Sequence, residues 1–217
     1  VAVLTSADGR GRDLLAGLRR GGSGSAVRVV AVERVDPALP DLADPLAALA
    51  SSGADVLAVL AERPVAARAA SALRGLAWRP LTLAVGLSGA TADGTVSVGF
   101  LKEPTDRAWA EDGGLRLYRA ILARHARGAD ARDVLHLYGM AAAHALVEVL
   151  ERAGASPTRR SVLEQLRSLR VAGSPFLLPG IVLRSGPRDS FPVEQVRLQR
   201  REAGRWQAFG GLFGAGA

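Results

Sequence analysis

The runs DVLAVLA (55–61), PVAARAASALRGLAW (64–78) and LTLAVG (81–86) decide the fold class. The first and last are short, continuously apolar and rich in Val and Leu, which is typical of strands buried on both faces. The middle run is rich in Ala and has Pro at its first turn, which predicts a helix. Two such strands joined by one helix predict a βαβ crossover and a parallel sheet.

The same alternation fills the first hundred residues. Further strands are predicted at 1–4, 27–32 and 95–100, and further helices at 11–20 and from Asp41, as its cap, to about Ser52. We therefore expect an α/β fold, with a doubly wound and mainly parallel sheet over residues 1–100.

After residue 101 the pattern changes to longer helices. Helices are predicted within 104–126, at 134–153 ending at Gly154, and from a Ser156 cap to about 170. Short strands follow at 181–183, 193–199 and 206–209, the last two forming a hairpin through 202–204. The sheet is thus expected to carry extra C-terminal helices and a short β hairpin, with a frayed tail from Gly210.

Composition excludes several classes of protein. The net charge is +7, but Lys102 is the only lysine and the arginines are scattered, often beside Asp or Glu. No stacking aromatics are interleaved with them, which argues against a nucleic-acid partner and against a basic membrane-binding stretch. Cysteine is absent, so disulfides and thiolate chemistry are excluded. His125, His136 and His144 form no metal-ligand pattern, and no uninterrupted apolar run reaches about 18 residues.

Six short motifs, in this order, resemble the second lobe and closing segment of type I periplasmic binding proteins of the leucine/isoleucine/valine-binding branch. They are Val1-Ala2-Val3-Leu4 followed by 8–13, Gly53-Ala54-Asp55-Val56-Leu57, Gly75 with Trp78 and Pro80, Lys102-Glu103-Pro104-Thr105-Asp106 with Trp109, Tyr138-Gly139 before 141–153, and Gly204-Arg205-Trp206. Together, in this order, the six motifs extend over roughly 200 residues of the chain.

The resemblance implies a two-lobed clamshell that captures branched-chain or similar small amino acids in its cleft and presents them to an ABC permease. It implies no catalysis and no cofactor, and a periplasmic or extracellular, lipid-anchored location. It also implies that 1–131 is the second lobe, that 132–190 packs with the first lobe, and that 191–217 is the closing hairpin with its tail. Because Val1 already lies in a strand, we expect the first lobe to precede it. The chain on its own should then bind such ligands weakly or not at all.

Five residues are candidates for ligand binding. Asp8 and Arg10 follow the first strand, and Arg10 could pair with a ligand carboxylate or be a solvated loop residue. Glu62 follows the strand at 55–61 and could hold an α-ammonium group or favour a helix N-terminus. Ser88 lies in the loop that the family uses for side-chain selection, or in an ordinary turn. Tyr138 could line the cleft or belong to the core.

Two other functions stay open. Gly9-x-Gly11 between a strand and a helix is part of a dinucleotide fingerprint, and Glu33 is expected to end the second strand, where a ribose-binding acid would lie. Leu14 stands where that fingerprint has its third glycine, and no catalytic His or Lys site follows. The alternatives are therefore an NAD-dependent enzyme, which titration with NAD would reveal, and a ligand-sensing receptor domain of the same fold.

Overall fold

The structure is a computed structural model that describes residues 1–85 and 92–214. The chain forms two compact units, named here the sheet unit, Val1–Val98 with Gln199–Gln207, and the helical unit, Gly99–Leu198 with the chain from Ala208 on. The first segment of the sheet unit ends at Val98, and within the helical unit Leu101 bridges Leu177. The assignment of 1–131, 132–190 and 191–217 to particular lobes stays a prediction.

The sheet unit confirms the predicted fold class. Its sheet has the strand order β2-β1-β3-β4-β5-β8-β9, and the pairs from β2 through β5 are all parallel. Its elements are β1 (Ala2–Ser6), α1 (Gly9–Gly21), β2 (Ala31–Val35), α2 (Ala43–Ala50), β3 (Val56–Leu60), α3 (Arg63–Arg74), β4 (Leu81–Ala84) and β5 (Val96–Gly99), joined by parts of β8 (Gln195–Glu202) and β9 (Arg205–Gly214).

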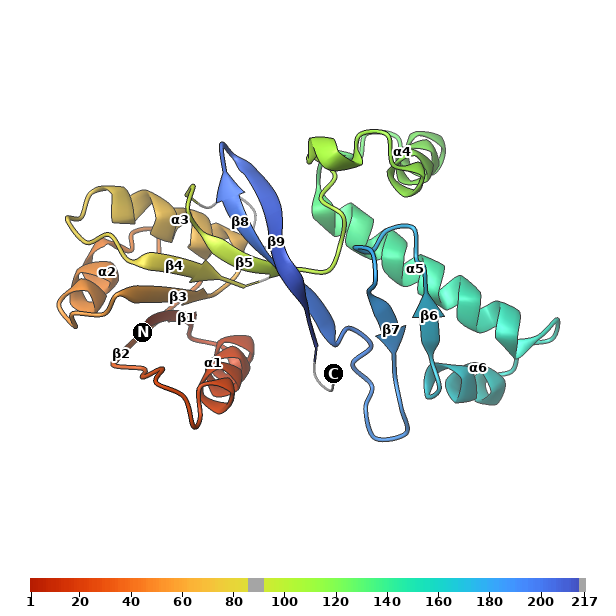
Figure 1. Cartoon of the computed structure of the whole chain (residues 1–217), viewed down its shortest axis with the longest axis horizontal. Helices are drawn as coiled ribbons and strands as arrows, with labels where there is room; N and C mark the ends of the chain where they lie inside the picture. Colours follow the sequence, from red (N-terminus) through yellow and green to blue (C-terminus); the bar gives the residue numbers. More distant parts are fainter. Residues whose placement is uncertain (86–91, 215–217) are drawn as a thin grey trace. The chain divides into compact units, whose positions relative to one another are not determined.

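Helices cover both faces of this sheet, with α1 on one face and α2 and α3 on the other (Figure 1). The side chains of β1 alternate accordingly: Ala2 and Leu4 pack with Leu46 and the rest of the α2–α3 core, whereas Val3 packs with Leu15 of α1. All five residues of β1 are buried, which explains its continuous apolar run.

The order of the strands creates a switch point between β1 and β3. The chain leaves β1 through α1 to form β2 on one side, and then returns through α2 to form β3 on the other side. The two connections therefore diverge at the carboxyl ends of β1 and β3. In open α/β sheets the crevice outside such a point is where ligands bind.

The helical unit contains a 3-10 turn, three α-helices and a small antiparallel ribbon. These are η1 (Arg107–Trp109), α4 (Gly113–His125), α5 (Val134–Ala153), α6 (Arg159–Leu166), β6 (Arg170–Ala172) and β7 (Val182–Arg184). The predicted bounds of α5 are confirmed: Asp133 caps its first turn, and Gly154 ends it with a φ of 90°, which favours glycine.

Several predicted details were wrong. The second strand, β2, begins at Ala31 and not at Val27. Residues 31–35 pair with β1, whereas 27–30 are not part of this pairing. The cap of α6 is Thr158 rather than Ser156, because the Thr158 hydroxyl accepts from the Ser161 amide in a reciprocal capping box. Residues 210–214 belong to β9 and are not frayed.

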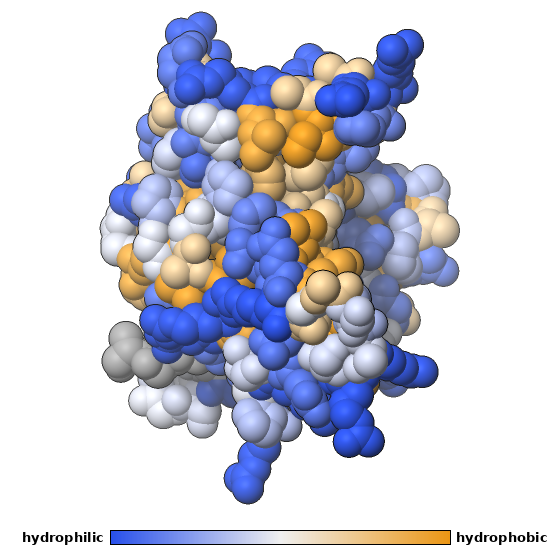
Figure 2. Space-filling view, turned by 90° about the vertical axis from the view of Figure 1, so that its right-hand side faces the viewer, coloured by the Kyte–Doolittle hydropathy of each residue, from blue (hydrophilic) through white to orange (hydrophobic). Residues whose placement is uncertain are grey.

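An apolar stripe on α5 faces solvent. Among the described residues α5 is the one helix long and apolar enough to cross a membrane, with 22% of that window buried. Helices of soluble proteins can also be this long and this apolar, so the length and composition of α5 do not identify it as a membrane span. Figure 2 shows apolar patches on the side of the molecule where α5 ends in Figure 1. The exposed large apolar side chains of the stripe are Leu135, Tyr138, Leu146, Val147 and Leu150.

Candidate functional site

The N-terminus of α1 is pressed against the carboxyl end of β1. The Asp8 carboxylate caps the helix, with its Oδ1 accepting from the Gly11 amide at 2.7 Å. A Cβ atom on Gly11 would lie 2.0 Å from the Ser6 carbonyl oxygen, so only glycine permits this approach. The tight turn fixes Arg10, the second residue of α1, at the switch point.

Arg10 and Glu62, both predicted as site residues, are brought together there. Arg10 Nη1 lies 2.9 Å from Glu62 Oε1, although 52 residues separate them along the chain. Glu62 stands at the cap position of α3, but its side chain makes no capping hydrogen bond. Both side chains are more than half exposed, at 61% and 55%, so the pair contributes little to stability and can exchange partners.

Two buried hydroxyls end β1, and they were not predicted from the sequence. The Thr5 hydroxyl lies within hydrogen-bond distance of the carbonyl oxygens of Gly11 and Leu60, at 3.1 and 3.2 Å. Ser6 Oγ is buried and has no hydrogen-bond partner in the part of the chain that the structure describes. In the sequence, both hydroxyls are marked only by small polar residues at the end of an apolar strand, just before the turn at the switch point.

The other two predicted residues do not join this group. Ser88 lies outside the described residues. Tyr138 belongs to the helical unit, where its half-exposed ring packs edge-on against Phe100 with the ring centroids 6.2 Å apart. Its role at a ligand site stays a prediction.

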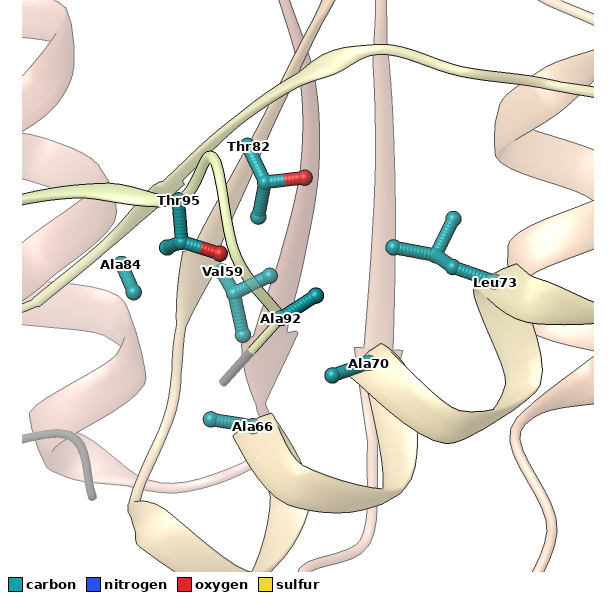
Figure 3. Close-up of a pocket in the computed structure, with 8 residues that line it drawn as sticks. All are labelled: Val59, Ala66, Ala70, Leu73, Thr82, Ala84, Ala92 and Thr95. Atoms are coloured by element: carbon teal, nitrogen blue, oxygen red, sulfur yellow. The ribbon is translucent and has the colours of Figure 1, made fainter. Parts of the chain in front are cut away.

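A small cavity lies beneath α3, on the sheet side of the helix (Figure 3). Ala66, Ala70 and Leu73 of α3 face Val59, Thr82 and Ala84 of the sheet, and Ala92 and Thr95 complete the lining. Its volume is about 20 Å³, room for about one water molecule. The cavity is thus a packing void between small side chains and too small for an amino acid.

The residues of the proposed dinucleotide site are arranged differently from that fingerprint. Glu33 lies in the middle of β2, which continues to Val35, so the expectation that Glu33 ends the strand was wrong. The need for Gly11 is explained by the packing of α1 on β1. Within residues 1–85 and 92–214, no three His, Asp or Glu side chains gather as metal ligands would.

A doubly wound sheet with charged groups at its switch point defines a small-molecule-binding α/β protein. The family model for periplasmic binding proteins matches residues 1–205, and the chain belongs to that family. Comparison with curated proteins finds no match.

Solved structures share the fold at low sequence identity. A branched-chain amino acid ABC transporter protein from Thermus thermophilus with bound valine is 19% identical, with a TM-score of 0.82 over 99% of this chain and 60% of that one. A solute-binding protein from Rhodopseudomonas palustris in complex with 3,4-dihydroxybenzoic acid is 16% identical, with a TM-score of 0.72 over 99% and 60%. A fatty acid ABC transporter substrate-binding protein from Thermomonospora curvata is 15% identical, with a TM-score of 0.73 over 99% and 57%. The chain spans about 60% of the length of these structures.

Proposed function

We propose that the chain is part of the solute-binding subunit of an ABC importer and captures branched-chain or similar small amino acids. The observation that carries this proposal is the exposed Arg10–Glu62 ion pair at the switch point of the sheet. A free amino acid is a zwitterion, with a carboxylate and an ammonium group on one carbon. It can therefore replace the internal pair by two ion pairs of its own, with Arg10 binding the carboxylate and Glu62 the ammonium group.

The ligands of the similar structures support the role of Arg10. Valine, 3,4-dihydroxybenzoic acid and a fatty acid have a carboxylate in common, and among them only valine carries an ammonium group. Arg10 suits all three ligands, whereas Glu62 suits the amino acid alone. Within this proposal Asp8 holds the Arg10 turn, the Ser6 hydroxyl offers a further hydrogen bond, and Ser88 contacts an apolar side chain.

The proposed partners follow from the family. The loaded protein would deliver its ligand to an ABC permease, in the periplasm or as a lipid-anchored protein outside the cell. The chain would bind its ligand without transforming it, as members of this family typically do.

Affinity of the chain alone should be low. One binding surface leaves the ligand half solvated, and each missing charge-assisted hydrogen bond weakens binding by roughly 1.5–3 kcal/mol. Two or three such losses amount to about three orders of magnitude or more in the dissociation constant.

Ligand-observed NMR detects such weak binding and tests the proposal. Valine, leucine and isoleucine should show saturable binding, and Arg10→Gln should remove it. Glu62→Gln should weaken these amino acids and spare 3,4-dihydroxybenzoate, whereas the surface control Arg19→Gln should change nothing. Saturable binding of dihydroxybenzoate alone would retain a solute-binding function but refute the amino-acid ligand, and equal binding by all variants would refute the site.

A further inference from the structure

Five arginines that are scattered along the sequence meet on one surface of the helical unit. Arg159, Arg160 and Arg167 line an open hollow of about 490 Å³ along α6, together with Leu163 and Glu164. Arg167 also lines a second hollow of about 370 Å³, together with Arg170 and Arg184. Because they share Arg167, the two hollows form one surface, named here the arginine face.

Like charges on the arginine face oppose each other at close range. In the antiparallel ribbon of β6 and β7, Arg170 and Arg184 are direct cross-strand partners. Such a pair of like charges destabilises a ribbon in the absence of an anion. The guanidinium of Arg152, which is paired with Glu148 at 3.4 Å, donates a hydrogen bond to the Arg170 carbonyl oxygen at 2.8 Å and so holds this strand against α5.

The acidic groups nearby are too few to balance this charge. Glu164 lies in the first hollow, and Glu194, which is hydrogen-bonded to Asp189, interacts electrostatically with Arg184, so three carboxyl groups face the five guanidinium groups. The five arginines of the face form no ion pair within 4.0 Å in the part of the chain that the structure describes, and all five are exposed. The arginine face therefore has the electrostatic character of an anion-binding surface.

An aromatic side chain projects into solvent beside this charge. Phe191 is 78% exposed, and its amide donates to Asp189 Oδ1 at 2.9 Å, which fixes the turn that carries it. The neighbouring Pro192 accepts a hydrogen bond from the Arg184 amide at 3.0 Å, so Phe191 is anchored next to the second hollow. Leu163 and Leu166 add exposed apolar surface along α6. Figure 2 shows hydrophilic and apolar groups side by side on this end of the molecule.

We propose that the arginine face docks on an anionic phospholipid surface. Guanidinium groups bind phosphate oxygens in a bidentate manner, and shallow open hollows lined by them fit lipid headgroups that lie in a plane. Exposed Phe and Leu beside arginine are the side chains that enter the boundary between headgroups and acyl chains. An acidic protein partner would need only the charges and would leave Phe191 without a role. This docking is independent of solute binding.

Co-sedimentation of the whole chain with vesicles tests the proposal. Vesicles of phosphatidylcholine with about a third phosphatidylglycerol should bind the chain, those of phosphatidylcholine alone should not, and salt should release it. Each arginine near an anionic surface raises partition about fivefold. The variant with Arg159, Arg160, Arg167 and Arg184 all changed to Gln should therefore lose roughly a hundredfold or more in partition.

A matched control separates the arginine face from net charge. Arg19, Arg20, Arg28 and Arg34 of the sheet unit are also exposed, and changing these four to Gln lowers the net charge by the same four units. The control should keep vesicle binding, Phe191→Ser should weaken it severalfold, and Arg184→Gln should raise the melting temperature because it relieves the repulsion with Arg170. Equal loss in both quadruple variants, binding to neutral vesicles, or no vesicle binding at all would overturn the proposal.

Discussion

Two ion pairs of nearly equal length differ in their contact with water. Arg10 and Glu62 are 2.9 Å apart and more than half exposed, whereas Lys102 Nζ lies 2.8 Å from Asp112 Oδ2 with side-chain exposures of only 10% and 21%. Lys102 also donates to the Pro175 carbonyl oxygen at 2.8 Å. The first pair is therefore free to rearrange, whereas the second joins three segments of the helical unit.

Removing the buried cation should cost far more stability than removing the exposed one. Lys102→Met leaves the Asp112 carboxylate and the Pro175 carbonyl without their donor, and we expect a loss of about 2–3 kcal/mol. Arg10→Gln, the control, should cost about 0–1 kcal/mol. Urea denaturation followed by circular dichroism measures both, and equal losses would contradict this assignment of roles.

The Lys102–Asp112 pair also predicts the acid sensitivity of the helical unit. Burial raises the pKa of Asp112, but hydrogen bonds from Lys102 and from the Leu115 and Gly114 amides outweigh it, so the pKa falls below the ordinary 3.8. The stability from this group is complete above the unfolded pKa and is lost as the pH falls through the lower folded pKa. Asp112→Asn should thus melt below the wild type at about pH 6 and approach it near about pH 2.5. A constant difference across this range would refute it.

At the scale of elements, two glycines of α1 have opposite roles. A Cβ on Gly11 would meet the Ser6 carbonyl oxygen at 2.0 Å and Thr5 Oγ1 at 2.7 Å, whereas nothing lies within 4 Å of a Cβ on Gly17. Gly11→Ala must push α1 away from β1, and we expect a loss of about 3 kcal/mol or more. Gly17→Ala should instead stabilise the helix by about 0.5–1 kcal/mol. Thermal melting distinguishes them, and similar shifts for both would show that α1 does not pack as described.

How far the sequence predicts an element depends on whether local or distant contacts decide it. The bounds of α5 follow from a local cap at Asp133 and a local stop at Gly154; the range 134–153 and its end at Gly154 were predicted correctly, whereas the cap was not predicted. The start of β2 depends on its register with β1, which residues 27–30 do not reveal despite their β-branched side chains.

The site shows the same division. The positions of Arg10 and Glu62 at strand ends were predictable from the βαβ pattern. Their pairing depends on β3 lying next to β1, which is a property of the whole sheet. The Ser6 hydroxyl and the arginine face were missed. Small polar residues at the end of β1 indicate its position but not that its hydroxyl is buried and unpaired, and nothing along the chain marks the meeting of α6 with β6 and β7.

At the scale of the whole molecule, we expect the apolar stripe of α5 to drive association. Leu135, Tyr138, Leu146, Val147 and Leu150 of this stripe are all exposed. Contiguous apolar surface of this kind favours contact between molecules, so the chain alone should self-associate as its concentration rises. Because the stripe runs along one helix, substitutions within it should act together.

A pair of matched double variants tests this prediction. Leu146 and Val147 on the stripe are 47% and 51% exposed, and Val27 and Val30 outside it are 48% and 55% exposed. Leu146→Gln with Val147→Gln should shift the chain toward monomer in sedimentation velocity, because polar side chains remove the driving force for contact while keeping helix propensity. Val27→Gln with Val30→Gln removes similar exposed apolar surface as isolated residues and should leave association unchanged. If both pairs dissociated the assemblies equally, general surface hydrophobicity would be the cause. A wild-type chain that stays monomeric at high concentration would mean that the stripe does not drive association at all.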